Sequence, residues 1–396
     1  MYFNVYLYNT ISTDPTYIAW MVAASAVAAT LTTLIMGAVS DRIGTRKKLI
    51  CWGYLLWGLT TAAFGLVTVS TAKALFPMAN AAAVAAAMVV ALDCIMTFFG
   101  STANDAAFNA YITDHVENEH RGRVESVLAI LPLIAMLVIF GGFDAMTRNG
   151  QWKLFFAIFG GLVTLVGIAG FFLIPETPLA PKRTPFLQNM LYGFKPSVAR
   201  SQPRLYLSLA AMCVFSIAVQ VFFPYLIIYM QHFLLMDNFA MVLGVVLIVA
   251  SLVSVLMGKT IDRAGKLRIT LLAAGVMLAG LIGMYFARGA VSVILAGSVM
   301  MSGYMVVTAA LSAEIRDRTP QDRAGHFQGI RMIFAVMVPM LIGPFIGAAV
   351  IRGNAQTYVE LGITKTVPTP AIFLAAGATL LLVLIPVLLL RRRENA

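Results

Sequence analysis

The sequence predicts an all-α, polytopic membrane protein built from two six-helix halves. Three observations support this prediction: long uninterrupted apolar segments, few charged residues and an internal repeat. Of the 396 residues, 60% are hydrophobic and 11% are charged, whereas soluble domains have about 25% charged residues. This composition excludes a soluble domain. It also excludes an outer-membrane barrel, because barrel strands alternate polar and apolar residues over about ten positions.

Eleven segments are long and apolar enough to cross a bilayer, which takes about 20 helical residues. The chain begins with a shorter apolar segment, residues 1–11, which is followed by a loop signal at residues 12–16. We expect this segment to be the outer part of a first helix whose beginning is missing, and a short interfacial helix is the alternative. The expected spans are 17–40, 48–70, 82–112, 124–146, 152–174, 205–231, 238–258, 268–287, 290–315, 325–351 and 369–390.

Basic residues are distributed unevenly between the loops. With residue 1 at mid-membrane and the chain running outward, 21 Lys and Arg residues fall on one side and six on the other. Lys and Arg gather in cytoplasmic loops, so the richer side is predicted to be cytoplasmic. This topology accounts for the net charge of +11 without nucleic acid. We expect a monomer in the cell membrane, the cytoplasmic membrane if bacterial, with helix bundles at 1–174 and 205–396 and a cytoplasmic linker at 175–204.

Two pairs of segments reveal the repeat. Gly37-Ala-Val-Ser-Asp-Arg-Ile-Gly44 matches Gly258-Lys-Thr-Ile-Asp-Arg-Ala-Gly265 at an offset of 221 residues, and residues 110–114 match residues 313–317 at an offset of 203. Both copies run in the same direction. In one class of transporter, parallel halves of this kind form a substrate site at their interface near mid-membrane.

The repeated pattern G-x-x-x-D-R-x-G resembles the signature of the major facilitator superfamily. Residues 119–123 resemble its acidic and Arg-Gly-Arg loop, and Pro-Glu-Thr-Pro at 175–178 resembles a run common in its sugar-transporting branches. The resemblance covers the whole chain, and it implies the major facilitator fold and alternating access. It also implies a cytoplasmic latch that holds the two halves together in the outward-open state; alternatively, these charges only set topology. The latch residues would be Gly37, Asp41, Arg42, Gly44, Arg46, Gly258, Asp262, Arg263, Gly265, Asp114, Arg121, Arg123, Glu314 and Arg331.

Of the 17 acidic residues, eleven lie in or near the predicted cytoplasmic loops and four belong to the outer side, which leaves two within a span, Asp93 and Asp105. An ionisable group in a span costs at least ~2.5–3.5 kcal/mol unless it faces a cavity or a partner, so both are functional candidates. On an α-helix, a polar arc of about 80° would contain Asp93, Thr97, Ser101 and Asn104, with Asp105 about 40° beyond. We expect this arc to line a cavity. The alternative is a stripe of hydrogen bonds between helices.

A second candidate set combines aromatic and amide side chains of the first and seventh helices. Its members are Tyr8, Gln220, Tyr225 and Tyr229, and the first and last share the offset of 221. Rings with polar tips suit the faces of sugars and other amphipathic solutes. The alternative is an aromatic belt at the membrane interface.

Within the superfamily, the chain resembles the glycoside–pentoside–hexuronide cation symporters. Residues 35–37 resemble the end of their second helix, and Asp105 with Phe108 lies where they carry a cation-binding aspartate. Their two further acids would fall at about Ala29 and Thr33, where this chain has none. A lone carboxylate favours proton coupling over sodium.

The resulting hypothesis is a proton-driven secondary transporter, a symporter of a small polar solute, with a sugar or glycoside favoured. A multidrug or metabolite exporter of the same superfamily is the first alternative, and a non-transporting membrane receptor or scaffold is the second. The sequence has no P-loop and no G-x-S-x-G elbow, so no enzyme activity is expected. The three cysteines and four histidines have no metal-ligand spacing, so neither a metal nor a cofactor is expected.

Overall fold

The computed structural model describes residues 2–12, 14–43, 45–115, 135, 138–139, 141–147, 149–175, 196–319, 329–353, 356–360 and 363–394. Within these ranges, ten helices are long and apolar enough to cross a membrane. Each overlaps one of the expected spans, and most of the remaining expected span, 124–146, lies outside the described residues. The prediction of an all-α polytopic protein is therefore confirmed.

The chain divides into two compact units. The N-unit comprises Tyr6–Ser12 and Ala24–Phe186, and the C-unit comprises Met1–Val5, Thr13–Ala23 and Leu187–Ala396. Residues 1–5 and 13–23 thus belong to the C-unit, although the sequence repeat assigns them to the first copy. The bundle and linker boundaries expected from the sequence, at residues 174 and 205, stay a prediction.

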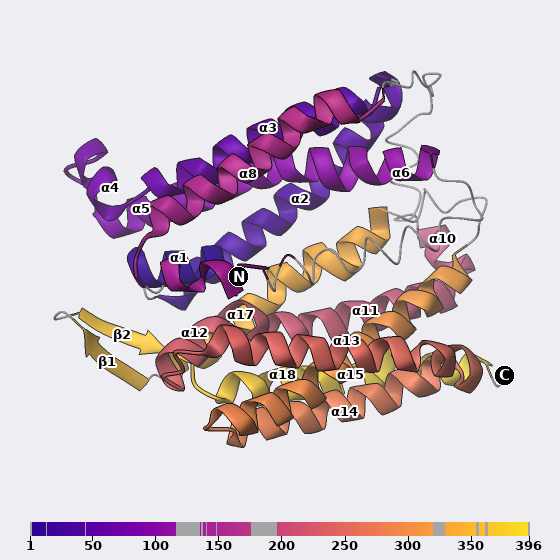
Figure 1. The fold of residues 1–396 in the computed structure, drawn as a ribbon. Coiled ribbons are helices and arrows are strands. Elements are labelled where there is room, and N and C mark those ends of the chain that lie inside the picture. Colours follow the sequence, from indigo (N-terminus) through magenta and orange to yellow (C-terminus); the bar gives the residue numbers. More distant parts are fainter. Residues whose placement is uncertain are drawn as a thin grey trace. The chain divides into compact units, whose positions relative to one another are not determined.

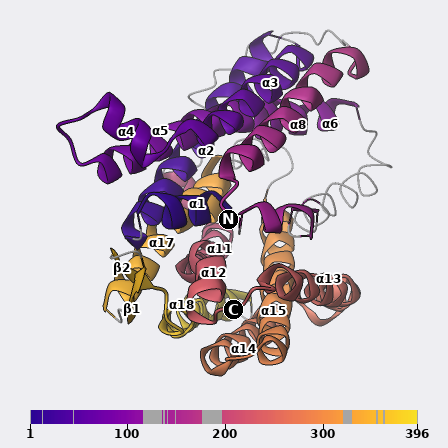
Figure 2. The same ribbon diagram turned by 60° about the vertical axis from the view of Figure 1, so that its left-hand side comes forward.

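The helices of the N-unit follow the expected spans. They are α1 (Tyr2–Thr10) and α2 (Pro15–Ile43), whose first residues belong to the C-unit, and α3 (Lys47–Ala63), η1 (Phe64–Leu66), α4 (Val69–Leu75), α5 (Ala81–Gly100), the π-helix η2 (Ser101–Phe108), α6 (Asn109–His115) and α8 (Trp152–Leu173). Helices α3 and α8 lie side by side (Figures 1 and 2). Glycines permit this contact, because a Cβ at Gly58 would lie 2.5 Å from the carbonyl oxygen of Gly160.

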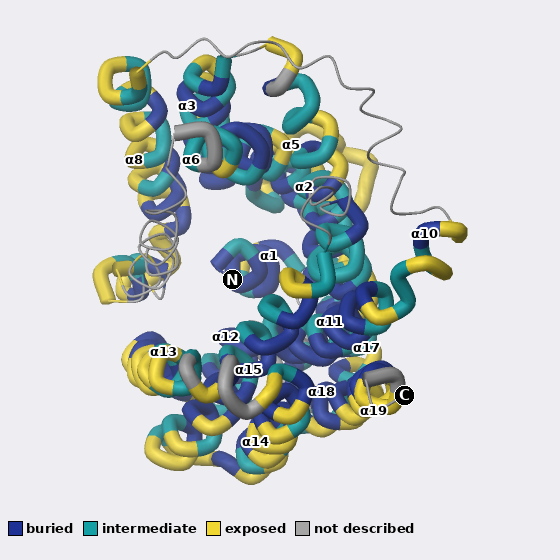
Figure 3. The backbone as a smooth tube through the Cα atoms, turned by 90° about the vertical axis from the view of Figure 1, so that its right-hand side faces the viewer, coloured by how far each residue is buried: buried dark blue, intermediate teal, exposed yellow. Residues whose placement is uncertain are grey.

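The C-unit surrounds a buried central helix, α11 (Pro203–Phe222). In the span Pro203–Phe233, 72% of the most apolar 18-residue stretch is buried inside the protein. Helices α13 and α14 instead each expose one face (Figure 3). Its other elements are α10 (Pro196–Ser201), η3 (Phe223–Tyr225), α12 (Leu226–Ile228), the π-helix η4 (Tyr229–Phe233), α13 (Phe239–Ala264), α14 (Lys266–Phe286), α15 (Ala290–Arg318), the π-helix η6 (Ile333–Met337), α17 (Val338–Gly353), α18 (Ala371–Leu381) and α19 (Leu384–Glu394).

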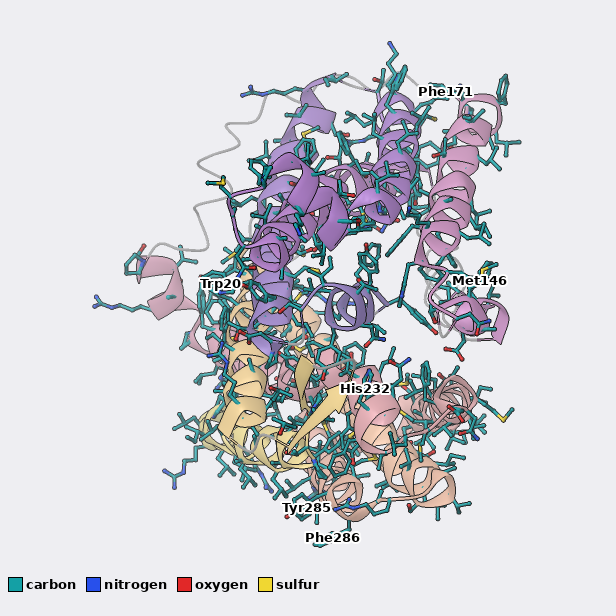
Figure 4. The ribbon with its side chains drawn as sticks, turned by 90° about the vertical axis from the view of Figure 1, so that its left-hand side faces the viewer. Trp20, Met146, Phe171, His232, Tyr285 and Phe286 are labelled. Carbon is teal, nitrogen blue, oxygen red and sulfur yellow. The ribbon has the colours of Figure 1, made fainter. Side chains whose placement is uncertain are left out.

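Apolar side chains remain exposed along the spanning helices of both units. The Phe286 side chain at the end of α14 is 70% exposed, and Figure 4 shows it with Tyr285 at the edge of the C-unit. In the N-unit, Leu165 of α8 is 63% exposed. Exposed apolar surface on this scale is what a bilayer covers, which agrees with the spans.

A short β-hairpin lies between α17 and α18. Strand β1 (Gln356–Glu360) pairs antiparallel with β2 (Ile363–Val367), so that Gln356 is opposite Val367 (Figure 1). Strand β2 contacts α17 and η4. The predicted spans leave residues 352–368 outside any helix, and the sequence analysis did not predict strands there. The β-branched residues of both segments favour extended backbone.

The first offset of the sequence repeat recurs in the helix ends. Helix α2 ends at Ile43 and α13 ends at Ala264, which are 221 residues apart. The two copies therefore share this helix boundary on the side predicted to be cytoplasmic.

Candidate functional site

One buried acidic side chain lies in the middle of a spanning segment, in α5 of the N-unit. Asp93 is 6% exposed, within an apolar span of 32 residues, Ala81–Ile112. The Ser25 side chain of α2 hydrogen-bonds to it, and the Ser25 hydroxyl lies 2.8 Å from the Thr97 hydroxyl. One carboxylate and two hydroxyls thus meet between α2 and α5, inside a segment that is otherwise apolar.

A second polar group lies further along the same span, in the π-helix η2. The Asn104 amide donates to Asp105 Oδ1 at 3.1 Å, and the Tyr54 hydroxyl of α3 donates to Asn104 Oδ1 at 3.2 Å. Asp105 is half-buried. This carboxylate is therefore reached through a chain of hydrogen bonds from α3, whereas Asp93 contacts α2.

The π-helix explains why the acids of this span have different neighbours. The expected polar arc assumes an α-helix throughout, whereas α5 ends at Gly100 and η2 begins at Ser101. A π-helix bonds residue i to i+5 and has more residues per turn, so side chains beyond Ser101 rotate relative to those before it. Ser101 itself is 5% exposed. Short π segments inside α-helices occur frequently at functional sites.

The aromatic set is buried in protein rather than exposed to lipid. Tyr8 is 2% exposed, and Tyr225 and Tyr229 are fully buried, so the three rings do not form a lipid-facing belt. The Tyr225 hydroxyl donates to the carbonyl oxygen of Pro344 at 2.8 Å and also lies 3.2 Å from that of Pro15. Its hydroxyl is therefore engaged by backbone groups of the C-unit. Gln220 is half-buried and packs against Gly343. A Cβ added at Gly343 would lie 2.5 Å from the Cβ of Gln220.

Tyr229 differs from Tyr225 in having a hydroxyl without a partner among the described residues. Its ring stacks on Phe233 at 5.2 Å and meets the edge of Phe373 at 5.1 Å. The buried Tyr229 hydroxyl makes no hydrogen bond among the described residues, and the same holds for Gln231 Oε1. Buried polar groups are nearly always hydrogen-bonded in proteins, so this hydroxyl is available to a water molecule or a solute.

The residues of the expected latch are described only in part. Arg46 is 7% exposed and donates to the Ser40 hydroxyl at 2.6 Å, and Glu314 forms an ion pair with Arg318. Lys266 and Asp317 form a further ion pair between α14 and α15, which the sequence analysis did not predict. Arg331 is half-buried and Arg42 is exposed. The side chains of Asp41, Asp114, Asp262 and Arg263 are not described, and Gly44, Arg121 and Arg123 lie outside the described residues.

The glycines of the latch pattern do not share one role. A Cβ at Gly37 or Gly258 would meet nothing within 4 Å among the described residues, so close helix contact does not account for them. Gly265, between α13 and α14, has a φ of 90°, a conformation that residues with a Cβ rarely adopt. A backbone requirement therefore explains this glycine.

No group of three or more metal-ligating side chains that could hold a metal ion occurs within the described part of the chain. The described polar groups of the two candidate sets are carboxylates, hydroxyls and amides. They can bind a proton or a polar solute by hydrogen bonds.

A family model described as Major Facilitator Superfamily matches residues 1–344. The chain belongs to the major facilitator superfamily. It is a multi-pass membrane protein of a family of secondary transporters and not an enzyme. No curated protein matches the chain.

Two solved structures share the fold across nearly the whole chain. Both are nucleoside transporter NupG, one of them a mutant form. The mutant has a TM-score of 0.75 at 12% identity and covers 98% of this chain and 94% of its own. The other has a TM-score of 0.69 at 12% identity, with coverages of 97% and 92%. The comparisons support the superfamily but not the glycoside–pentoside–hexuronide branch.

Proposed function

We propose that this transporter couples proton movement to the transport of a small, hydroxyl-rich solute, and that Asp93 carries the coupling proton. The observation behind this proposal is the burial of Asp93 between α2 and α5 with two hydroxyls beside it. Ionisable groups at membrane depth mark ion and proton pathways. Asp105 is the second candidate, because it is only half-buried and is already bonded by Asn104.

The chemistry of the neighbours fits reversible protonation. A hydroxyl has one donor and two acceptor positions. The Ser25 hydroxyl can donate to the carboxylate or accept a hydrogen bond from the neutral acid, and the Thr97 hydroxyl can adjust in turn. Both charge states of Asp93 can therefore be hydrogen-bonded without moving a helix. A sodium ion would need several oxygen ligands in a closed shell, and α2 has alanine and threonine at positions 29 and 33.

The solute class is inferred from Tyr229 and from the fold relatives. A buried tyrosine hydroxyl without a partner suits a solute that offers hydroxyls or a polar ring. The two similar solved structures are nucleoside transporters, and a nucleoside is a glycoside of a nitrogenous base. Nucleosides therefore fall within the glycoside class favoured by the sequence, and they are the first solutes to test.

The test is uptake into proteoliposomes of the full chain with labelled uridine, adenosine and a panel of sugars. For one proton per solute, a gradient of one pH unit corresponds to 1.36 kcal/mol and drives about tenfold accumulation. Asp93→Asn should abolish accumulation while leaving downhill exchange, because solute binding does not require the proton. Asp105→Asn is the matched variant and should still accumulate solute.

The outcomes separate the parts of the proposal. Tenfold accumulation by Asp93→Asn would contradict its coupling role, and loss of accumulation in Asp105→Asn alone would assign coupling to that residue. Accumulation driven by a sodium gradient but not by a pH gradient would contradict proton coupling. Downhill uptake of none of the nucleosides or sugars would contradict the solute class.

A further inference from the structure

An ion pair joins the beginning of α2 to the end of α17 within the C-unit. Arg352 Nη2 lies 3.2 Å from Asp14 Oδ1 and 3.4 Å from Oδ2, and Arg352 also donates to the Thr16 hydroxyl. Asp14 Oδ1 accepts hydrogen bonds from the Thr16 amide at 2.9 Å and from its hydroxyl at 2.6 Å. Three side chains thus form one connected polar group. Arg352 is 55% exposed and Asp14 is 43% exposed, so water reaches both.

A buried hydrogen bond lies next to this pair. The Tyr225 hydroxyl lies within hydrogen-bond distance of carbonyl oxygens at the start of α2, Pro15, and in the middle of α17, Pro344. Helix α17 approaches closely because it has a glycine at position 347, where a Cβ would lie 2.7 Å from the Tyr225 ring. One tyrosine therefore ties two helix segments to α11 and η3.

One aromatic contact and one amide hydrogen bond also join the start of the chain to α17 and η3. The Trp20 ring of α2 meets the edge of the Phe345 ring of α17, with centroids 5.2 Å apart. The Asn4 side-chain amide of α1 donates to the carbonyl oxygen of Pro224 at 3.2 Å. Residues from the start of the chain therefore contact α17 and η3 at four places.

The sequence repeat assigns the two sides of these contacts to different copies. Residues 1–5 and 13–23 belong to the first copy by the repeat, whereas α17 and η3 belong to the second, and yet all of these lie in the C-unit. Beyond Ala23, the same helix α2 continues into the N-unit. Asp14 and Arg352 both lie on the side that the distribution of basic residues predicts to be outer. The contacts thus connect the two copies at their outer ends.

We propose that Asp14, Thr16, Tyr225 and Arg352 form an outer clasp, which is closed in one state of the transport cycle and opens in the other. The half-exposed ion pair suits this role, because water replaces its hydrogen bonds at little cost when it separates. The buried Tyr225 hydroxyl holds the carbonyl oxygens of Pro15 and Pro344 in one fixed position in the closed state. The proposal rests on alternating access between two copies, and it requires neither Asp93 nor a particular solute.

The test measures opening directly by electron–electron resonance on the full chain in lipid nanodiscs. The three native cysteines are replaced, and spin labels are attached at Tyr17→Cys, near the start of α2, and Gly353→Cys, at the end of α17. A Cβ at Gly353 meets nothing within 4 Å among the described residues, so a label fits there. No solute or gradient is needed, so a wrong solute class or coupling ion leaves this experiment unaffected.

Arg352→Asp should raise the ratio of long-distance to short-distance populations, by up to about fivefold for an exposed pair. Exchanging the charges with Asp14→Arg in the same chain should return the ratio toward its original value. Lys73→Asp is the matched control, since it reverses an exposed charge of α4 on the side predicted to be outer and should leave the ratio unchanged. Arg352→Gln serves as a milder second variant if the charge reversal prevents folding.

Three results would overturn the clasp. An unchanged distance distribution in Arg352→Asp and Arg352→Gln, with lower thermal stability, would show a static joint. No recovery in the charge-exchanged double variant would show that the two charges act separately. An equal shift in Lys73→Asp would show a general response to outer charge.

Discussion

Two tyrosines of the seventh span provide a sharp comparison, because they differ in hydrogen bonding and not in burial. Tyr225 and Tyr229 are both fully buried, four residues apart. The Tyr225 hydroxyl donates at 2.8 Å to the Pro344 carbonyl oxygen, whereas the Tyr229 hydroxyl has no partner among the described residues. Replacing each with phenylalanine removes one oxygen atom and keeps the ring. Tyr225→Phe should destabilise the protein, and Tyr229→Phe should not.

The expected sizes follow from the two environments. A typical intramolecular hydrogen bond contributes about 0.5–1.5 kcal/mol to stability, and a buried polar group left without a partner costs about 1–3 kcal/mol. Tyr225→Phe should therefore lose about 1 kcal/mol of unfolding free energy. Tyr229→Phe removes a hydroxyl that already lacks a bond, so its stability should be unchanged or higher by up to about that penalty.

The buried cysteines supply the assay. Cys51 and Cys213 are buried in the folded protein, so a maleimide dye that fluoresces on reaction with thiols reports unfolding as temperature rises. The midpoint of Tyr225→Phe should fall below that of the unsubstituted protein, and that of Tyr229→Phe should not. A loss of stability in Tyr229→Phe as large as that in Tyr225→Phe would refute the reasoning, because it would reveal a protein partner for the Tyr229 hydroxyl.

The same pair also tests the solute site. If the Tyr229 hydroxyl binds solute, Tyr229→Phe should raise the KM for downhill uptake by about 5- to 10-fold, the equivalent of one hydrogen bond, without a loss of stability. Tyr225→Phe lies outside that site and should instead change the outer clasp population. An unchanged KM in Tyr229→Phe would remove its hydroxyl from solute binding.

Two further predictions concern packing and the cytoplasmic latch. Gly280→Ala should destabilise the C-unit by about 1–3 kcal/mol, because its Cβ would meet the backbone of Met300. Gly275→Ala in the same helix serves as the control, since its Cβ would meet nothing within 4 Å among the described residues. Equal unfolding midpoints for the two variants would contradict this packing argument. Asp41→Asn should lower the transport rate at normal expression, since acids contribute little to topology; an undiminished uptake rate would favour charges that act only on topology.

The sequence was sufficient for the spans because hydrophobic length is a local property. A run of about 20 apolar residues must become a helix in a bilayer, since its backbone groups have no other partners there. Ten expected spans are accordingly found as helices within the described residues. The repeat needed only the identity of a few Gly, Asp and Arg residues, such as Gly37 and Gly258.

The site could be predicted only as a set of residue types. The positions of Asp93 and Asp105 inside a span identified them as candidates, but their different neighbours depend on the change from α-helix to π-helix at Ser101. That change leaves no periodicity signal in eight residues. Similarly, Tyr225 and Tyr229 are the same residue type in the same span, and the hydrogen bond of Tyr225 to Pro344 distinguishes them only in the structure. The pairing of Asp14 with Arg352 joins residues 338 positions apart and has no sequence signature beyond opposite charges on one side.

The difference between the two copies gives a physical reason to look for coupling in the first one. By the offset of 203, Asp93 corresponds to Ala296, Thr97 to Met300 and Asp105 to Thr308 in α15. Helix α15 is a continuous α-helix from Ala290 to Arg318, without the π segment of the first copy.

Packing explains the residue of the second copy, because the Ala296 Cβ lies 3.0 Å from the position that a Cβ at Gly283 of α14 would take. Packing does not explain a carboxylate in one copy and an alanine in the other, because burying the charge costs free energy that the alanine avoids. The acids of α5 and η2 therefore point to a task performed once per molecule, as the binding of a single coupling proton would be.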